Sequence, residues 1–338
     1  MKYGILDYQT ETSIEDKILD DGDIICFDCS DECKLPDEIE TLDAVSLWHN
    51  ISLTENSLKR LTNCKVIVRI GVGYDNVDIK TAGAFGIPVV NIPDYGTNDV
   101  ADHTLALMLS AVRNIPSYSK ALRENKSRGW LPSFGGEIHR LTNLTLGIIG
   151  IGRIGSAVAM RAKAFGMNVA FYDPYVPDGY DKTYQCKRFE SLYQLMNVSD
   201  ILTIHTPLTN ETTNLINKDL LRKAKPGMIL INTARGKIVN SDDVYHALKE
   251  GWIRFFAADV LQHEPPRDTD LLFNAYLGNA DNLQNRILLT PHSAFFAQES
   301  REEMRMKNAY QMKNGANGIA LRNCVNKEYL VNPRTPVL

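Results

Sequence analysis

A short apolar run leads directly into a glycine-rich turn in the stretch Leu144-Thr145-Leu146-Gly147-Ile148-Ile149-Gly150-Ile151-Gly152-Arg153-Ile154-Gly155. The run is typical of a buried parallel strand, and residues 154–165 after it have the pattern of a helix. In the spacing G-x-G-x-x-G, the first glycine allows a tight turn, the second lets a ligand approach the backbone, and the third allows close helix–strand packing. Free N–H groups at the helix N-terminus favour a pyrophosphate. The stretch therefore predicts a phosphate cradle for a dinucleotide, formed by Gly150, Gly152, Arg153, Ile154 and Gly155.

An acidic residue at the end of the next predicted strand supports this interpretation. Asp173 follows Gly155 by 18 residues. A carboxylate at this place would accept hydrogen bonds from the adenosine ribose and repel a 2′-phosphate. Pro174 and Tyr175 follow, so no adjacent Arg or Lys favours NADP, and we expect NAD as the cofactor. In the structural alternative, Asp173 caps a turn and the glycines serve chain geometry alone.

Apolar, β-branched runs alternate with helical patterns along most of the chain, as in parallel α/β sheets. The predicted strands are 2–6, 24–27, 44–48, 65–70 and 88–92, followed by 144–150, 168–173, 201–206, 228–234, 255–260 and 286–290. The last six match the strand count of a doubly wound dinucleotide-binding domain. We therefore predict an α/β fold in which a Rossmann NAD-binding domain (101–296) is inserted into a smaller flavodoxin-like substrate domain (1–100 plus 297–338).

Three helices have clear signals. A long, largely buried helix is predicted at 99–112, with Asn98 as its N-cap. A second helix, 242–250, is entered through Asn240 or Ser241 and ended by Gly251. A third helix runs from 298 to about 314.

The composition is that of an ordinary soluble globular protein. The 338 residues are 44% hydrophobic, with 37 Lys+Arg against 41 Asp+Glu and a net charge of −4. This balance, without a block of like charges, argues against nucleic acid or an anionic membrane as the partner. No apolar run reaches the ~18–20 residues of a membrane span. The polar residues soon after Met1 do not fit a signal peptide, so the cytoplasm is the expected location.

Three of the six cysteines, Cys26, Cys29 and Cys33, have the spacing C-x-x-C-x-x-x-C. A closed metal site needs four ligands, and no fourth Cys or His lies nearby in the sequence. Cys26 ends an apolar run, where a thiol packs as a small hydrophobe. We expect reduced thiols and no metal.

Three chemically distinct side chains follow three predicted strands of the second domain, where doubly wound sheets bind ligands. Arg235 offers a planar donor fork suited to a carboxylate. Glu264 is an acid followed by two prolines, and His292 is the residue type that titrates near neutral pH. If Glu264 binds one imidazole nitrogen, the other can exchange a proton with a substrate oxygen. In the structural alternative these are a turn arginine, a solvated acid and a strand-end histidine.

These segments together resemble the D-2-hydroxyacid dehydrogenase family. The likeness runs in matching order from about residue 66 to 296. Its segments are 71–78 (GVGYDNVD), 150–155 (GIGRIG), Asp173, 205–209 (HTPLT), 232–236 (NTARG), 259–265 (DVLQHEP) and 290–292 (TPH). Residues 67–71, 162–166 and 171–175 are similar to the C-terminal-binding-protein branch in particular.

The resemblance implies specific roles. Arg235 would bind the substrate carboxylate and C2 oxygen, His292 would be the general acid/base, and Glu264 its partner. The implied cofactor contacts are Thr104, His205, Thr206, Pro207, Thr212, Thr233, Ala234 and Asp259, with Asp259 holding the nicotinamide carboxamide. Besides Arg235, the implied substrate contacts are Val72, Gly73, Tyr74 and Phe295. The resemblance also implies a homodimer built through the cofactor domains.

Two features depart from the family pattern. The binding-protein branch tends to have a tryptophan where Phe295 stands, so an aromatic wall is kept but the preferred 2-oxo acid is left open. The segment 264–286 is longer than the usual link, and is either a surface insertion or a lid.

Two functions follow from these observations. The first is NAD-dependent interconversion of a small 2-oxo acid and its D-2-hydroxy acid. The alternative is an NAD(H)-sensing, corepressor-like dimeric scaffold with little or no turnover. The intact set of Arg235, Glu264 and His292 favours the enzyme. We also expect the chain to end at Leu338 without the long disordered extension of the binding-protein branch, and this expectation favours the enzyme as well.

Overall fold

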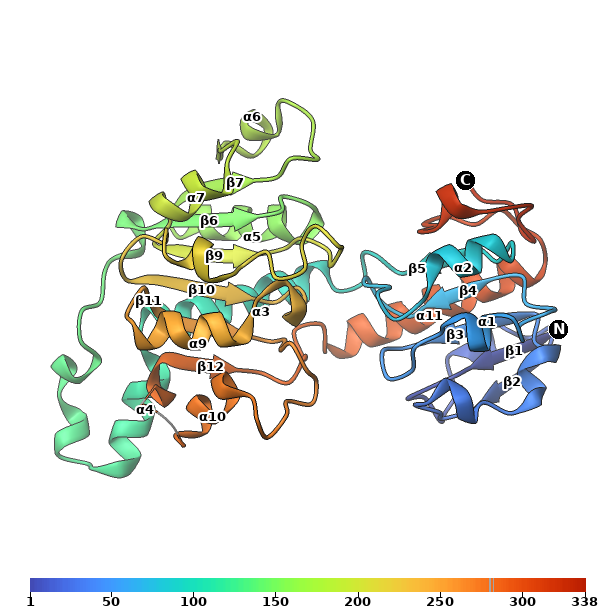
Figure 1. Ribbon diagram of the computed structural model, residues 1–338, viewed down its shortest axis with the longest axis horizontal. Coiled ribbons are helices and arrows are strands. Elements are labelled where there is room, and N and C mark those ends of the chain that lie inside the picture. The colour runs from blue at the N-terminus through green and yellow to red at the C-terminus, as the bar shows by residue number, and fades with distance from the viewer. Residues whose placement is uncertain (280, 282) are drawn as a thin grey trace. The chain divides into compact units, whose positions relative to one another are not determined.

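The chain divides into two compact units (Figure 1). The computed structural model describes residues 1–279, 281 and 283–338. One unit comprises Met1–Gly96 and Phe296–Leu338, and the other comprises Thr97–Phe295. The second unit is therefore a continuous segment inserted into the first.

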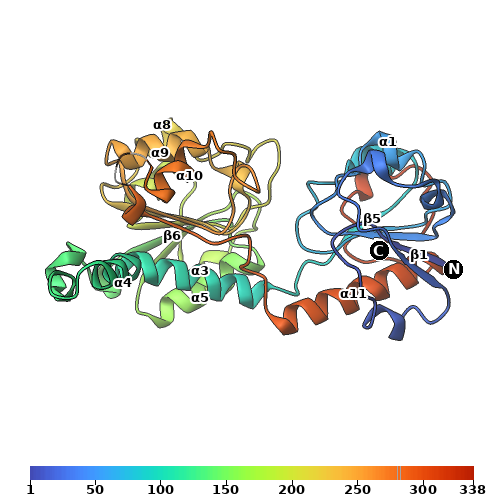
Figure 2. The same cartoon turned by 90° about the horizontal axis from the view of Figure 1, so that it is seen from below.

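The first unit contains a parallel sheet in the order β2-β1-β3-β4-β5, which is the strand order of flavodoxin-like folds. Its strands are β1 (Lys2–Ile5), β2 (Asp23–Cys26), β3 (Ala44–Leu47), β4 (Ile67–Arg69) and β5 (Val89–Asn91). Its helices are α1 (Glu55–Leu58), α2 (Ile79–Ala84) and α11 (Gln298–Ala316). Helix α11 packs on β3 and β4, on the opposite face of the sheet from α1 (Figure 2).

The inserted unit contains a parallel sheet in the order β12-β11-β10-β9-β6-β7-β8. Its strands are β6 (Thr145–Ile149), β7 (Asn168–Tyr172), β8 (Lys187–Arg188), β9 (Ile201–Ile204), β10 (Met228–Asn232), β11 (Ile253–Ala258) and β12 (Ile287–Leu289). The strand order reverses between β6 and β9, as in a doubly wound sheet. Because the strands are parallel, all of their C-terminal ends lie at one edge.

Helices cover both faces of this second sheet. They are α3 (Thr97–Val112), α4 (Ile115–Glu124), α5 (Arg153–Ala164), α6 (Tyr180–Tyr184), α7 (Leu192–Val198), α8 (Lys218–Leu221), α9 (Ser241–Lys249) and α10 (Leu271–Leu277). Helices α3 and α5 lie on one face, and α8, α9 and α10 on the other (Figure 2). Two separate apolar cores result, one on each face. The predicted α/β fold with a Rossmann-type sheet is confirmed.

Two local predictions were wrong. The sheet has a seventh strand, β8, because a two-residue strand beside β7 is too short to give a periodic signal. Asn98 is not an N-cap, since α3 already begins at Thr97. The Asn98 side-chain oxygen instead accepts a hydrogen bond from Arg161 Nη2 (3.1 Å). Asn240, by contrast, caps α9 by accepting from the Asp243 N–H (3.1 Å).

The segment 264–286 contains the packed helix α10. Its residues Leu272 and Ala275 are fully buried in the core on the α9 face. The segment is therefore part of the layer that covers the sheet, rather than only a surface insertion or a lid. Residues 280 and 282 of this segment lie outside the described residues.

Residues 115–139, which we call the arm, contain α4 and a series of short turns beside the second sheet (Figure 1). The arm exposes several large apolar side chains. They are Ile115, Leu122, Trp130, Leu131 and Phe134, with exposed fractions of 53%, 38%, 75%, 54% and 43%. In the described part of the chain, no helix has the length and apolar character needed to cross a membrane.

Candidate active site

The glycine-rich turn between β6 and α5 leaves an open approach to its backbone. Gly150 has a φ of +86°, and a Cβ there would come within 2.8 Å of the His205 carbonyl oxygen. A Cβ at Gly155 would lie 2.0 Å from the Gly150 carbonyl oxygen, so glycine lets α5 pack against the turn. At Gly152, however, nothing lies within 4 Å of an added Cβ. The packing does not require glycine at 152, and the free space at the N-terminus of α5 fits the phosphates of a dinucleotide.

Asp173 is fixed beside this turn, just after β7. Its Oδ2 accepts a hydrogen bond from the Ile151 N–H (3.0 Å), and its Oδ1 accepts from the Tyr175 N–H (3.0 Å). A carboxylate has about four acceptor positions, so it retains capacity for a ligand. Asp173 therefore does cap the turn, and the same geometry also fits ribose recognition. Arg153 is exposed at the first position of α5.

His205 supports the turn from the end of β9. Its N–H donates to the Ile149 carbonyl oxygen (2.8 Å), and its Nε2 contacts Thr203 Oγ1 (3.0 Å). Burial lowers the pKa of His205 to about 3. The imidazole is therefore neutral at physiological pH and shapes the backbone beneath the cradle without adding charge.

Glu264 and His292 form a close pair beyond β11 and β12. The His292 Nδ1 lies 2.6 Å from Glu264 Oε2, and Glu264 Oε1 accepts from the Leu261 N–H (2.9 Å). Burial by itself raises the pKa of Glu264, but the hydrogen bond and charge of His292 outweigh it, and the net pKa is lowered. An ionised Glu264 favours a proton on Nδ1 and so fixes the tautomer and the orientation of the imidazole. The Phe295 ring stands edge-on to the imidazole, with centroids 6.3 Å apart.

Asp259 organises the loop that carries His292. Its buried carboxylate accepts hydrogen bonds from Thr290 Oγ1 (2.6 Å), the Ser293 N–H (2.9 Å) and the Ala294 N–H (2.9 Å). Its carbonyl oxygen accepts from the His292 N–H (2.7 Å). His292 has a φ of +52°, which is unfavourable for a residue with a side chain. The contacts of Asp259 hold the loop in this conformation.

Helix α3 contributes two polar side chains to the same edge of the sheet. His103 Nε2 lies 2.9 Å from Thr290 Oγ1 and 3.6 Å from Asp259 Oδ1. Thr104 is buried, and its hydroxyl lies 2.8 Å from the Thr233 hydroxyl at the end of β10. This hydrogen bond between the two hydroxyls joins α3 to the C-terminal end of β10.

Arg235 follows β10 and is half-buried. Its Nη1 donates to the Ala234 carbonyl oxygen (2.8 Å), while its own carbonyl accepts from Asn232 Nδ2 (2.9 Å). Asn232 Oδ1 also accepts from the Ala234 N–H (3.0 Å). The charge of Arg235 contributes to lowering the pKa of Glu264, which places the two groups in the same electrostatic environment.

The other predicted residues lie on loops. Thr206 and Pro207 follow β9, and Thr212 Oγ1 donates to the Pro207 carbonyl oxygen (2.7 Å), which closes that loop on itself. Thr233 and Ala234 follow β10. In the first unit, Val72, Gly73 and Tyr74 lie in the loop after β4. In residues 1–279, 281 and 283–338, no group of three or more His, Cys, Asp or Glu side chains is placed to hold a metal ion.

The sequence alone gives no sign of the contacts that His103 makes at this edge of the sheet. His103 lies in α3, distant in sequence from Thr290 and Asp259, and no local pattern links them.

The comparisons with known proteins agree with this geometry. Residues 105–294, more than half of the chain, match the model of the D-isomer specific 2-hydroxyacid dehydrogenase NAD binding domain. The chain belongs to the D-2-hydroxyacid dehydrogenase family. The predicted resemblance and the NAD cofactor are confirmed by this match.

Two curated relatives and one solved structure illustrate the likeness. C-terminal-binding protein 1 of Caenorhabditis elegans is 33% identical over 305 residues, which is 87% of this chain and 40% of the relative. D-3-phosphoglycerate dehydrogenase of Methanocaldococcus jannaschii is 36% identical over 294 residues, 87% of this chain and 53% of the relative. The chain thus spans about half or less of each. The D-lactate dehydrogenase of Aquifex aeolicus, complexed with NAD and lactic acid, has a TM-score of 0.84 at 30% identity, covering 94% of this chain and 96% of that chain.

We predict that Asp259→Asn loosens the His292 loop. The introduced NH2 faces N–H and O–H donors, so at least one acceptor is lost, at a cost of about 1–3 kcal/mol. Hydrogen exchange should become faster at the amides of residues 292–294. Asp270→Asn is a matched control, because Asp270 is also buried and accepts a backbone hydrogen bond, from the Phe273 N–H (3.0 Å) at the start of α10. The control should leave exchange at 292–294 unchanged, and equal exchange in the two variants would contradict the role of Asp259.

Proposed function

We propose that this member of the D-2-hydroxyacid dehydrogenases interconverts a small 2-oxo acid and its D-2-hydroxy acid with NAD, using His292 as the general acid/base. The observation that carries the proposal is the 2.6 Å contact between His292 Nδ1 and Glu264. This pair lies at the C-terminal edge of the sheet that also presents the glycine-rich turn.

Each residue of the set has a distinct task. With Nδ1 held by Glu264, His292 gives a proton through Nε2 to the C2 oxygen of a 2-oxo acid, or takes one in the reverse direction. The ionised Glu264 stabilises the protonated imidazole. Arg235 binds the substrate carboxylate through its donor fork.

The cofactor and the remaining contacts complete the proposal. When bound, the nicotinamide supplies or accepts the hydride. The turn residues Gly150, Gly152, Arg153, Ile154 and Gly155 hold the pyrophosphate, and Asp173 holds the adenosine ribose. Phe295 forms an aromatic wall beside His292. The substrate contacts of Val72, Gly73 and Tyr74, and the carboxamide contact of Asp259, stay predictions.

We predict that His292→Ala lowers turnover by ~10²–10⁴ while NADH binding is retained, because the side chain moves a proton and does not hold the dinucleotide. The measurement is NADH oxidation across glyoxylate, pyruvate, phenylpyruvate and hydroxypyruvate. His246→Ala, on the exposed surface of α9, is the matched control and should keep full activity. If the unmodified chain binds NADH tightly and reduces none of these acids, the redox-sensing scaffold is the better function.

We predict that Asp173→Asn narrows the preference for NADH over NADPH by roughly tenfold, about 1.4 kcal/mol. The asparagine keeps an oxygen for the Ile151 N–H but loses the charge that repels a 2′-phosphate. The two dissociation constants, measured by nucleotide fluorescence, give the ratio. Asp178→Asn, a solvent-exposed acid six residues after β7, serves as the control. An unchanged ratio in Asp173→Asn would exclude its role in ribose recognition.

We further propose a homodimer that uses the arm, because the arm exposes several large apolar side chains, and exposed apolar surface often marks a protein–protein interface. The most exposed of these side chains is Trp130, at 75%. Trp130→Asp should shift sedimentation from dimer to monomer at micromolar concentration. Tyr193→Asp, at a similarly exposed aromatic residue of α7 (55%), should not. A monomer in the unmodified chain would refute this proposal.

A further inference from the structure

Two loops flank the glycine-rich turn at the C-terminal edge of the second sheet. The turn follows β6, which lies between β9 and β7 in the sheet (Figure 1). Residues 173–179 follow β7, and residues 205–217 follow β9. Asp173 in the first loop and Thr206 in the second are both expected to contact the cofactor. A contact between the two loops would therefore span the end of β6, beside the expected position of the dinucleotide.

The structure contains such a contact. The Tyr175 hydroxyl donates a hydrogen bond to Glu211 Oε2. This hydrogen bond is the largest of the effects that raise the pKa of Tyr175, so the hydroxyl remains a donor at neutral pH. Because Tyr175 follows β7 and Glu211 follows β9, the hydrogen bond joins the loops on the two sides of the glycine-rich turn.

Backbone contacts position both partners. The Tyr175 N–H donates to Asp173 Oδ1 (3.0 Å), which belongs to the carboxylate proposed to hold the adenosine ribose. On the other loop, Thr212 Oγ1 accepts from the Thr209 N–H (2.7 Å), and the Thr212 N–H donates to the Thr209 carbonyl oxygen (3.2 Å). Glu211 lies inside this turn, so the backbone that carries it is held in place.

The side chains of the pair are free to separate, unlike their backbones. Tyr175 is 75% exposed, and Glu211 is exposed as well. Exposed side chains change rotamer readily, and water can replace either partner of an exposed hydrogen bond. The contact is therefore suited to opening and closing, and contributes little to holding the fold together.

We propose that Tyr175 and Glu211 form a clasp across the cofactor site, which opens for NAD or NADH to enter or leave and closes again over the adenosine half. The inference rests on the proposed position of the adenosine at Asp173. It does not depend on turnover at His292, because the exchange of NADH is measured without a 2-oxo acid. A clasp that closes both with and without the cofactor slows entry and release alike, and so leaves the affinity nearly unchanged.

The test measures the rate constants of NADH binding and release by stopped-flow fluorescence, with excess NAD displacing NADH in the release experiment. Tyr175→Phe keeps the ring and loses the hydroxyl. It should bind and release NADH roughly threefold to tenfold faster, while the dissociation constant changes by less than about twofold. Glu211→Gln should give a smaller increase of the same kind, because its amide oxygen still accepts a hydrogen bond. The double variant should match Tyr175→Phe, since both changes remove one contact.

Two matched variants control for general effects. Tyr310→Phe, at an exposed tyrosine of α11 (53%), and Glu250→Gln, at the exposed C-cap of α9, should leave both rate constants unchanged. Tyr175→Phe keeps the backbone contact with Asp173, so the loop after β7 should keep its conformation. Equal rate constants in Tyr175→Phe and the unmodified chain would overturn the proposal. Faster release with an unchanged binding rate would also overturn it, since Tyr175 would then contact the bound nucleotide directly and would not close the path to it.

Discussion

The buried carboxylate of Asp259 is the interaction on which the geometry of the candidate site depends. It lies directly after β11 and binds three groups of the loop that follows β12. Through these contacts the end of β11 fixes the conformation of the loop that follows β12. His292 has a left-handed backbone conformation that a residue with a Cβ adopts at a cost, and the loop contacts offset that cost. The imidazole consequently meets Glu264, which stands on a different loop.

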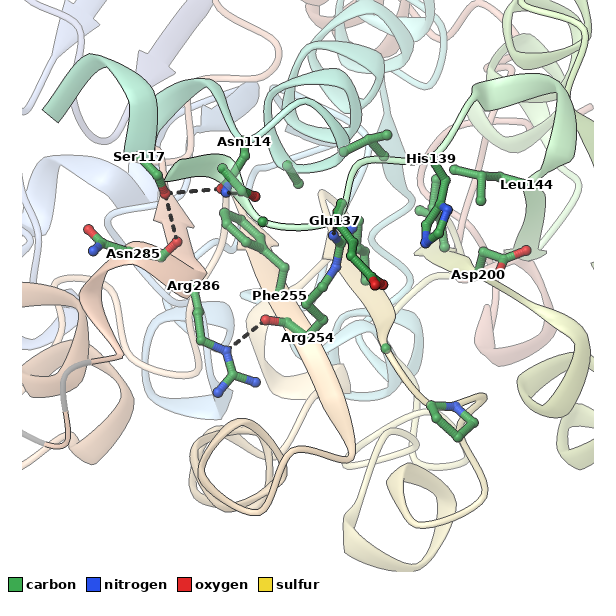
Figure 3. A pocket seen from close by; sticks show the side chains of 18 of the residues that line it. Asn114, Ser117, Glu137, His139, Leu144, Asp200, Arg254, Phe255, Asn285 and Arg286 are labelled. Atoms are coloured by element: carbon green, nitrogen blue, oxygen red, sulfur yellow. Dashed lines mark hydrogen bonds between the residues drawn. The ribbon is translucent and has the colours of Figure 1, made fainter. Parts of the chain in front are cut away.

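Helix α3 adds further contacts to the loops that carry the candidate site. His103 and Thr104, near its middle, contact Thr290 and Thr233 at the C-terminal edge. Its last residues line a cavity of about 510 Å³ at the other edge, where Arg254 and Arg286 lie (Figure 3). A single helix therefore borders both the candidate active site and the cavity at the opposite edge of the sheet. Because α3 packs against β10 and β11 along its length, a shift at one edge is resisted by contacts at the other.

Sequence patterns correctly predicted the features of the fold that depend on residues close together in the chain. The glycine spacing, the apolar strands and the Asn240 cap each depend on residues close together in the chain, and each is found in the structure. Sequence patterns did not predict the features that depend on contacts between residues far apart in the chain. Asn98 looks like an N-cap, yet the helix extends past it and its side chain pairs with Arg161 of α5. His103 gave no local signal, because its partners lie on strands that are far away in the sequence.

The acceptor capacity of Asp259 limits what else this residue can do. A carboxylate has about four acceptor positions. Thr290, Ser293 and Ala294 already use three, and the Ser293 hydroxyl, at 3.4 Å, lies near the remainder. A nicotinamide carboxamide would therefore have to share Asp259 with the loop that holds His292. It follows that any such contact would couple the placement of the cofactor to the placement of the imidazole through one carboxylate.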